Sequence, residues 1–93
     1  MILEIVSPEA KLFSGEVTSI TVPGVDGSFQ ILNNHAPIVS LLQKGTINIT
    51  APSLKFSKET ADLFTKVSDQ NYTLAISSGT IEMKDNKVIV LAD

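Results

Sequence analysis

The sequence predicts an all-β domain, built as a sandwich or barrel of short strands. Runs rich in Ile, Val and Thr recur at close spacing, and Gly, Pro, Asn and Asp lie between them. The last two runs are separated only by Asp85-Asn86, a pair of residues that tolerate positive φ and therefore favour a hairpin. The 93 residues have the length of one domain, spanning residues 1–93, with enough apolar side chains for a single core.

The expected strands follow one another with few residues between them. They span residues 2–6, 16–22, 28–32, 37–42, 46–50, 72–76, 80–84 and 87–91, with a short apolar piece at Leu12-Phe13. Strict alternation in 46–50 predicts that Ile47 and Ile49 face the core. Proline presets φ and glycine accepts positive φ, so these residues mark turns. The predicted structural turns lie at Gly15, Pro23, Gly24, Gly45 and Gly79.

Residues 51–71 fit two interpretations. Ser57 is a candidate helix N-cap, and Leu63, Phe64 and Val67 follow at helical spacing. The same residues also fit a hairpin, in which 63–67 turns at 68–71 and pairs with 72–76. We expect the first of these, a short helix or irregular excursion near residues 57–67.

Composition excludes several classes of site and partner. The net charge is −3 and the seven Lys and Arg residues are scattered, so we expect neither nucleic-acid binding nor direct binding to anionic lipid. Cysteine is absent and histidine occurs once, which argues against a transition-metal site, and we expect no metal and no cofactor. No apolar run has the length of a membrane span, and the N-terminus lacks the basic residues of a signal peptide. Any association with a membrane is therefore expected to go through protein.

Catalysis has one weak candidate set. Ser28, His35 and Asp26 could be assembled into a triad, but Ser28 lacks the Gly-x-Ser-x-Gly elbow that exposes a nucleophile. Residues 33–35 read more simply as a polar turn. Because residues 23–37 concentrate turn signals around one strand, they indicate a loop region positioned for contact. A binding or structural module is favoured over a small hydrolase that uses His35.

An ordered series of short motifs carries a family resemblance. The series is Leu-Phe-Ser-Gly-Glu-Val at 12–17, Val-Pro-Gly-x-x-Gly at 22–27, Ile-Leu-x-Asn-His-Ala-Pro at 31–37, Lys-Gly at 44–45 and the closing stretch 78–93. It resembles the N-terminal domain of the F-type ATP synthase epsilon subunit, which is called delta in mitochondria. The resemblance implies a flattened ten-stranded β-sandwich in the central stalk. It also implies a non-catalytic role, coupling ion-driven rotation to ATP synthesis.

The resemblance also implies partners and contact residues. The partners are the gamma subunit, the c-ring of the membrane sector and, indirectly, the alpha/beta catalytic head, on the cytoplasmic face of a bacterial inner membrane. The loop implied to face the c-ring comprises Asp26, Gly27, Ser28, Phe29 and Gln30. The residues implied to contact gamma or the ring are Ser7, Asn34, His35, Ala36 and Pro37.

The sequence differs from the family pattern in several places, and three of these differences change what we expect. Ser28 stands where some relatives have a carboxylate, and Asp26 is then the residue expected to supply that charge. Residues 51–71 exceed the usual connection, so they are expected to be an insertion. The sequence stops at Asp93, where the family usually continues into a two-helix hairpin, so we expect no C-terminal helical domain and no inhibition of hydrolysis by that route. The alternative is a generic β-sandwich that binds another protein or a small ligand.

Overall fold

Ten strands and one 3₁₀ turn account for most of the residues that the structure describes. The computed structural model describes residues 1–52 and 54–93. In chain order the elements are β1 (Ile2–Val6), β2 (Lys11–Glu16), β3 (Ser19–Gly24), β4 (Gly27–Leu32), β5 (Ile38–Leu42), β6 (Gly45–Thr50), η1 (Ala61–Leu63), β7 (Phe64–Ser68), β8 (Asn71–Ile76), β9 (Gly79–Lys84) and β10 (Lys87–Ala92). The predicted all-β class is confirmed, and so is the ten-stranded sandwich.

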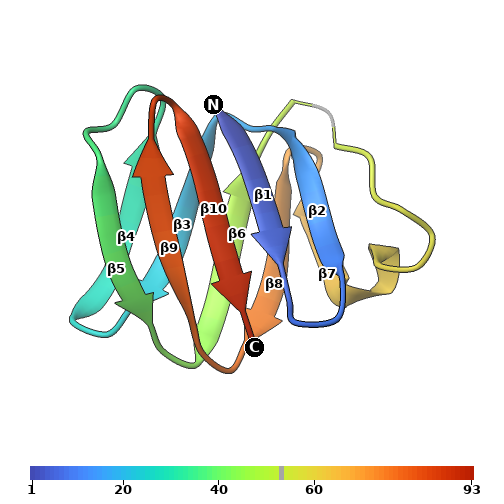
Figure 1. Cartoon of the computed structure of the whole chain (residues 1–93). Coiled ribbons are helices and arrows are strands. Elements are labelled where there is room, and N and C mark those ends of the chain that lie inside the picture. The colour runs from blue at the N-terminus through green and yellow to red at the C-terminus, as the bar shows by residue number, and fades with distance from the viewer. Residues whose placement is uncertain (53) are drawn as a thin grey trace.

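The strands form two layers (Figure 1). One layer has the order β2-β1-β10-β9-β5, and the other has the order β4-β3-β6-β8-β7. The layers join where Gly24 at the end of β3 pairs with Leu42 at the end of β5. Most neighbouring strands run antiparallel, but β1 and β10 are parallel, with Ile2 opposite Lys87 and Val6 opposite Leu91. Consecutive strands alternate in direction except for β6 and β7, which both run antiparallel to β8. The short connections between strands therefore fall at two opposite ends of the sandwich.

The core lies between the layers and is built by alternate residues of each strand. Ile47 and Ile49 are fully buried, as the alternation predicted. Other fully buried side chains include Leu3, Ile5, Ile20, Ile31, Ile81, Met83, Val88 and Val90. Burial of this apolar surface is the main free-energy term that holds the two layers together.

The Asp85-Asn86 hairpin forms as predicted, but two other predicted turns lie inside strands. Asp85 and Asn86 have φ of 54° and 60°, the positive values that a two-residue hairpin requires. Gly15 lies within β2, opposite Leu3, because the missing Cβ leaves room for the ring of Phe13. Pro23 and Gly24 are the last residues of β3. The proline fits a strand here because its missing N–H lies on the side of β3 away from β4.

Two further predicted turn residues, Gly45 and Gly79, are the first residues of β6 and β9. A Cβ at Gly45 would lie 2.8 Å from Cβ of Pro23. Gly45 therefore leaves room for the ring of Pro23, and Gly79 leaves room for the backbone of Leu91.

Residues 57–63 form an irregular excursion, one of the two forms expected for residues 57–67, whereas 64–67 belong to strand β7. A single 3₁₀ turn spans Ala61–Leu63, and β7 pairs antiparallel with β8, as in the hairpin interpretation. The hairpin prevails because β7 buries only Phe64 against the core, while Val67, which a helical period would place on the same face, is exposed. Residue 53, which falls within the predicted insertion 51–71, lies outside the described residues. That residues 51–71 are an insertion relative to the family stays a prediction.

An aromatic cluster closes the side of the sandwich between β2 and β7. Phe56 comes from the connection before η1, and its ring centroid lies 4.4 Å from that of Phe64 and 5.5 Å from that of Phe13. Tyr72 meets Phe56 edge-on at 5.1 Å. Leu54 also packs against the core from this connection. The segment therefore seals an edge that two strands alone would leave open to water.

Candidate functional site

The loop predicted to face the c-ring lies at one end of the sandwich, which we call the Asp26 end. It carries the connections at residues 7–10, 25–26, 43–44 and 77–78 (Figure 1, bottom). Asp26, Gly27, Ser28 and Gln30 are exposed, and Phe29 is half-buried. The amide of Val25 donates to the carbonyl oxygen of Leu41 at 3.1 Å, which ties the turn to β5. The turn therefore presents a fixed backbone and one carboxylate to its surroundings.

The second predicted group lies at the opposite end, the His35 end, with the connections at residues 33–37, 69–70 and 85–86. Asn34 has a φ of 61°, and its amide donates to Oδ1 of Asn86 at 2.8 Å. His35 is exposed, with Nδ1 2.7 Å from the carbonyl oxygen of Ala36. Ala36 and Pro37 are exposed as well. The polar turn thus satisfies its own backbone, as residues 33–35 suggested.

The structure does not bring all the predicted contact residues together. β4 spans six residues, or about 17 Å, between the Asp26 turn and the turn that holds His35. A triad of Ser28, His35 and Asp26 therefore does not form. Ser7 lies at the Asp26 end, where its hydroxyl donates to the carbonyl oxygen of Ala10 and accepts from the Ala10 amide, both at 3.2 Å. Ser7 and His35 are consequently at opposite ends of the molecule.

An exposed apolar surface on β5 and β10 was missed by the sequence analysis. We call Val25, Val39, Leu41 and Leu91 the outer-face patch. Val39 is 76 % exposed and Leu41 is 61 % exposed. Strand register places Leu41, Thr80, Leu91 and Val6 in one row across four strands, so their side chains share the outer face of the first layer. Val25 lines a hollow together with Leu41 and Leu91.

The patch had a sequence signal. In β5 the apolar residues Ile38 and Leu42 alternate with apolar Val39 and Leu41, so both faces of the strand are hydrophobic. Only the inward face is buried by the fold. A monomer seldom leaves a contiguous apolar patch exposed unless it contacts another molecule.

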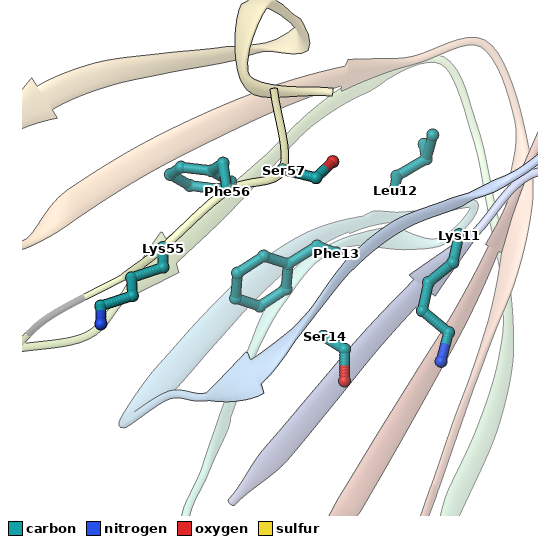
Figure 2. A pocket seen from close by; sticks show the side chains of 7 residues that line it. All are labelled: Lys11, Leu12, Phe13, Ser14, Lys55, Phe56 and Ser57. Carbon is teal, nitrogen blue, oxygen red and sulfur yellow. The ribbon is translucent and has the colours of Figure 1, made fainter. Parts of the chain in front are cut away.

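Another hollow lies beside the aromatic cluster, between β2 and the segment before η1 (Figure 2). It is lined by Lys11, Leu12, Phe13, Ser14, Lys55, Phe56 and Ser57. The two lysine side chains point away from the aromatic floor in Figure 2. Within residues 1–52 and 54–93, no group of three His, Asp or Glu side chains is placed to hold a metal ion. The hollow carries no arrangement that supports catalysis.

Comparison with known proteins decides the family. Residues 1–61 match the family model described as ATP synthase, Delta/Epsilon chain, beta-sandwich domain. The chain belongs to this family. The ATP synthase epsilon chain of Chlorobium limicola is 37 % identical over 91 residues, covering 98 % of this chain and 86 % of that relative. The epsilon chain of Neisseria meningitidis serogroup C is 38 % identical over 93 residues, covering all of this chain and 56 % of the relative.

Solved structures of ATP synthases share the fold of this delta/epsilon-chain member. One is the central stalk and c-ring of the Tetrahymena thermophila mitochondrial enzyme, with a TM-score of 0.66 and 16 % identity, covering 98 % of this chain and 61 % of that chain. Another is the Euglena gracilis mitochondrial enzyme, with a TM-score of 0.73 and 18 % identity, covering 99 % and 49 %. The chain spans a little over half the length of its Neisseria relatives. None of the helices in the described residues is long and apolar enough to cross a membrane.

One ion pair on the outer face gives a pH prediction. Glu4 of β1 accepts from Nζ of Lys87 on β10 at 3.0 Å and lies 4.0 Å from Nζ of Lys11. The hydrogen bond and charge of Lys87, with a smaller contribution from Lys11, lower the pKa of Glu4 below its ordinary value of 4.5. A lowered pKa stabilises the fold above the ordinary value, and that contribution is lost as pH falls through the lowered one.

We therefore expect Glu4→Gln to be less stable than the wild type at neutral pH, with the difference vanishing as the solution is acidified below pH 4.5. Urea denaturation at several pH values measures this difference. Lys87→Met should move the pKa of Glu4 back toward 4.5 in an NMR titration. Glu82→Gln, on the same face, is the control and should leave the titration of Glu4 in place. If the pKa of Glu4 does not change in Lys87→Met, Lys87 is not the main cause of the lowered pKa.

Proposed function

We propose that this chain is a non-catalytic subunit of the central stalk of an F-type ATP synthase. In this role it links the gamma subunit to the c-ring and transmits ion-driven rotation toward the alpha/beta head. Membership of the delta/epsilon family supports the proposal, as do relatives named ATP synthase epsilon chain. The complex would hold the chain at the cytoplasmic face of a bacterial inner membrane through protein contacts. The fold needs no cofactor for this role, because its task is mechanical.

The observation that carries the proposal is that an exposed apolar patch along β5 and β10 extends to the end of the molecule that holds the exposed Asp26 turn. The outer-face patch reaches the Asp26 end through Val25, which belongs to both the patch and the turn. We assign the patch to the gamma subunit, because an apolar surface of this kind is suited to burial against a rigid protein neighbour. We assign Asp26, Gly27, Ser28, Phe29 and Gln30 to the polar loops of the c-ring.

This orientation has a consequence for the remaining predicted contacts. If the Asp26 end rests on the ring, the His35 end points away from it. Ser7 then belongs with the ring-facing group, whereas Asn34, His35, Ala36 and Pro37 face gamma or the lower part of the catalytic head. A stiff sandwich suits this position, because a closely packed core transmits torque with little deformation.

The test is capture of gamma by the purified chain and by two valine variants. Val39 on β5 and Val67 on β7 are both exposed valines, at 76 % and 64 %, but only Val39 belongs to the patch. Val39→Asp should weaken capture of gamma by about tenfold or more, because it places a charge in an apolar contact, while Val67→Asp should bind like the wild type. Circular dichroism confirms that both variants are folded.

Two results would overturn the proposal. Equal capture of gamma by Val39→Asp and Val67→Asp would remove the patch from the interface. Failure of the folded wild-type chain to bind either gamma or a membrane fraction that contains the c-ring would remove the stalk assignment itself. Asp26→Lys separates the two surfaces, because it should weaken binding to the ring-containing membranes and leave capture of gamma intact.

A further inference from the structure

The outer edge of β4 has backbone groups with no strand beside them. β4 pairs with β3 along one side, from Ser19 opposite Leu32 to Gly24 opposite Gly27. The strand order places nothing on its other side among residues 1–52 and 54–93. β4 therefore lies at the edge of its layer, where its backbone can pair with another chain.

Strand register identifies which backbone groups point outward. The carbonyl oxygen of Pro23 accepts from the Gln43 amide at 2.8 Å, on the side of β3 away from β4. Opposed residues of an antiparallel pair alternate between hydrogen-bonded and non-hydrogen-bonded positions. Ser28, opposite Pro23, must therefore direct its N–H and C=O away from β3, and Gln30 does the same two residues later. The described residues supply no hydrogen-bond partner for these four groups.

β4 also lacks the features that usually protect an edge strand. Protection normally comes from charged side chains, proline or a bulge. Edge strand β2 carries Lys11 and has a register shift against β1, and edge strand β7 carries Lys66 and has a register shift against β8. β4 has the sequence Gly-Ser-Phe-Gln-Ile-Leu and a continuous register with β3. It contains no charge, no proline and no bulge.

The side chains around this edge favour an apolar neighbour on the inward side. Phe29 of β4 and Ile38 of β5 pack against the core but remain half-exposed. A strand laid along β4 would place alternate side chains toward Phe29 and the others beside Ser28 and Gln30. The edge thus specifies an extended backbone whose residues alternate between apolar and polar.

A second copy of the chain fits this edge poorly. Two copies joined edge to edge would share only about 17 Å of strand pairing, so a dimer would also need contacts that bring the two whole domains together. Each copy also has a net charge of −3, so the two copies repel each other. We propose that the free edge of β4 accepts an extended, uncharged segment of a partner protein as an additional strand. This inference concerns the lateral backbone groups of β4, whereas the ring assignment concerns the exposed side chains of residues 26–30; it goes beyond the proposed stalk function and does not depend on it.

Amide hydrogen exchange of the free chain tests the premise. The amides of Ser28 and Gln30 should exchange about a hundredfold faster than those of Phe29 and Ile31, because only the latter donate to β3. Equal protection of all four amides would mean that the edge is already occupied. Sedimentation of the same sample shows whether the chain is a monomer or a dimer. A dimer in which the Ser28 and Gln30 amides are protected would make a second copy the occupant of the edge and would overturn the proposal.

Binding to the full chain is tested with a defined uncharged probe, the capped peptide Ser-Thr-Val-Thr-Val-Thr-Ser. At saturation the Ser28 and Gln30 amides should exchange about tenfold more slowly, with NMR shifts concentrated on β4. Gln30→Pro removes an N–H that the fold does not use and should weaken binding about tenfold, whereas Gln30→Thr keeps the N–H and should bind like the wild type. The same peptide with its central residue replaced by proline should not bind.

The proposal is overturned if millimolar probe leaves the Ser28 and Gln30 amides unprotected, or if Gln30→Pro binds as well as Gln30→Thr. The exchange measurement on the wild-type chain stands even if Gln30→Pro does not fold. Because no gamma subunit is present in these experiments, their outcome is separate from that of the capture assay.

Discussion

Phe13→Ala is expected to lower the free energy of unfolding by about 3–5 kcal/mol. Phe13 is almost completely buried, and its ring is tilted against both Phe56 and Phe64, with centroids 5.5 and 6.0 Å away. Truncation would leave a cavity between β2 and β7 that the neighbouring rings cannot fill. A domain of this size has a total stability of about 5–14 kcal/mol, so the loss would be a large part of it.

Urea denaturation followed by tyrosine fluorescence measures this loss. Tyr72 is the only tyrosine, the chain has no tryptophan, and the ring of Tyr72 meets that of Phe56, so its signal reports on the same cluster. Phe56→Ala is the comparison variant, and it should cost less because Phe56 is only half-buried. A loss below about 1 kcal/mol for Phe13→Ala would show that the cluster adds little to the fold.

Gly79→Ala is expected to destabilise the protein by about 2–3 kcal/mol, which lowers the thermal midpoint by roughly 10 °C or more. Gly79 starts β9, with Leu42 of β5 on one side and Ala92 of β10 on the other. A Cβ at this position would overlap the carbonyl oxygen of Leu91, which is backbone and cannot rotate away. The central strands of the first layer would have to separate.

Gly15→Ala is the matched control for this prediction. Its new Cβ would lie 3.0 Å from Cζ of Phe13, the far end of a side chain, which can adjust. We expect a loss of about 1 kcal/mol or less, measured by the same thermal scan. Equal losses for the two variants would mean that the effect comes from β-strand glycine in general and not from the backbone contact at Gly79.

The sequence predicted those parts of the fold in which local chemistry and tertiary packing favour the same structure. Asp85-Asn86 tolerates positive φ, and the hairpin forms there; Ile47 and Ile49 alternate with polar residues, and both are buried. Gly15 was predicted to form a turn but lies within β2, because its missing Cβ leaves room for the ring of Phe13. Residues 57–63 are irregular, as one form of the expectation allowed, but 64–67 form a strand, because the helical spacing of Leu63, Phe64 and Val67 is outweighed by the pairing of β7 with β8 and the burial of Phe64.

The arrangement of the candidate site was less accessible to sequence reasoning. No local sequence pattern predicts that Ser7 and Asp26 lie at one end of the sandwich and His35 at the other. That arrangement follows from the directions of all the strands in the fold. The outer-face patch was also difficult to predict from the sequence. Val39 and Leu41 resemble core residues in composition, and only the pairing of β5 with β9 shows that they face outward.

The parallel pairing of β1 with β10 constrains how the protein is made. The first strand of the chain is completed by residues 87–91, which leave the ribosome last among the ten strands. During synthesis, Leu3 and Ile5 have one paired neighbour at most, and the core cannot close until the final strand arrives. A chain interrupted before residue 87 therefore exposes an apolar strand edge, which proteases and chaperones recognise. The core of this domain is therefore expected to close only after β10 has been synthesised.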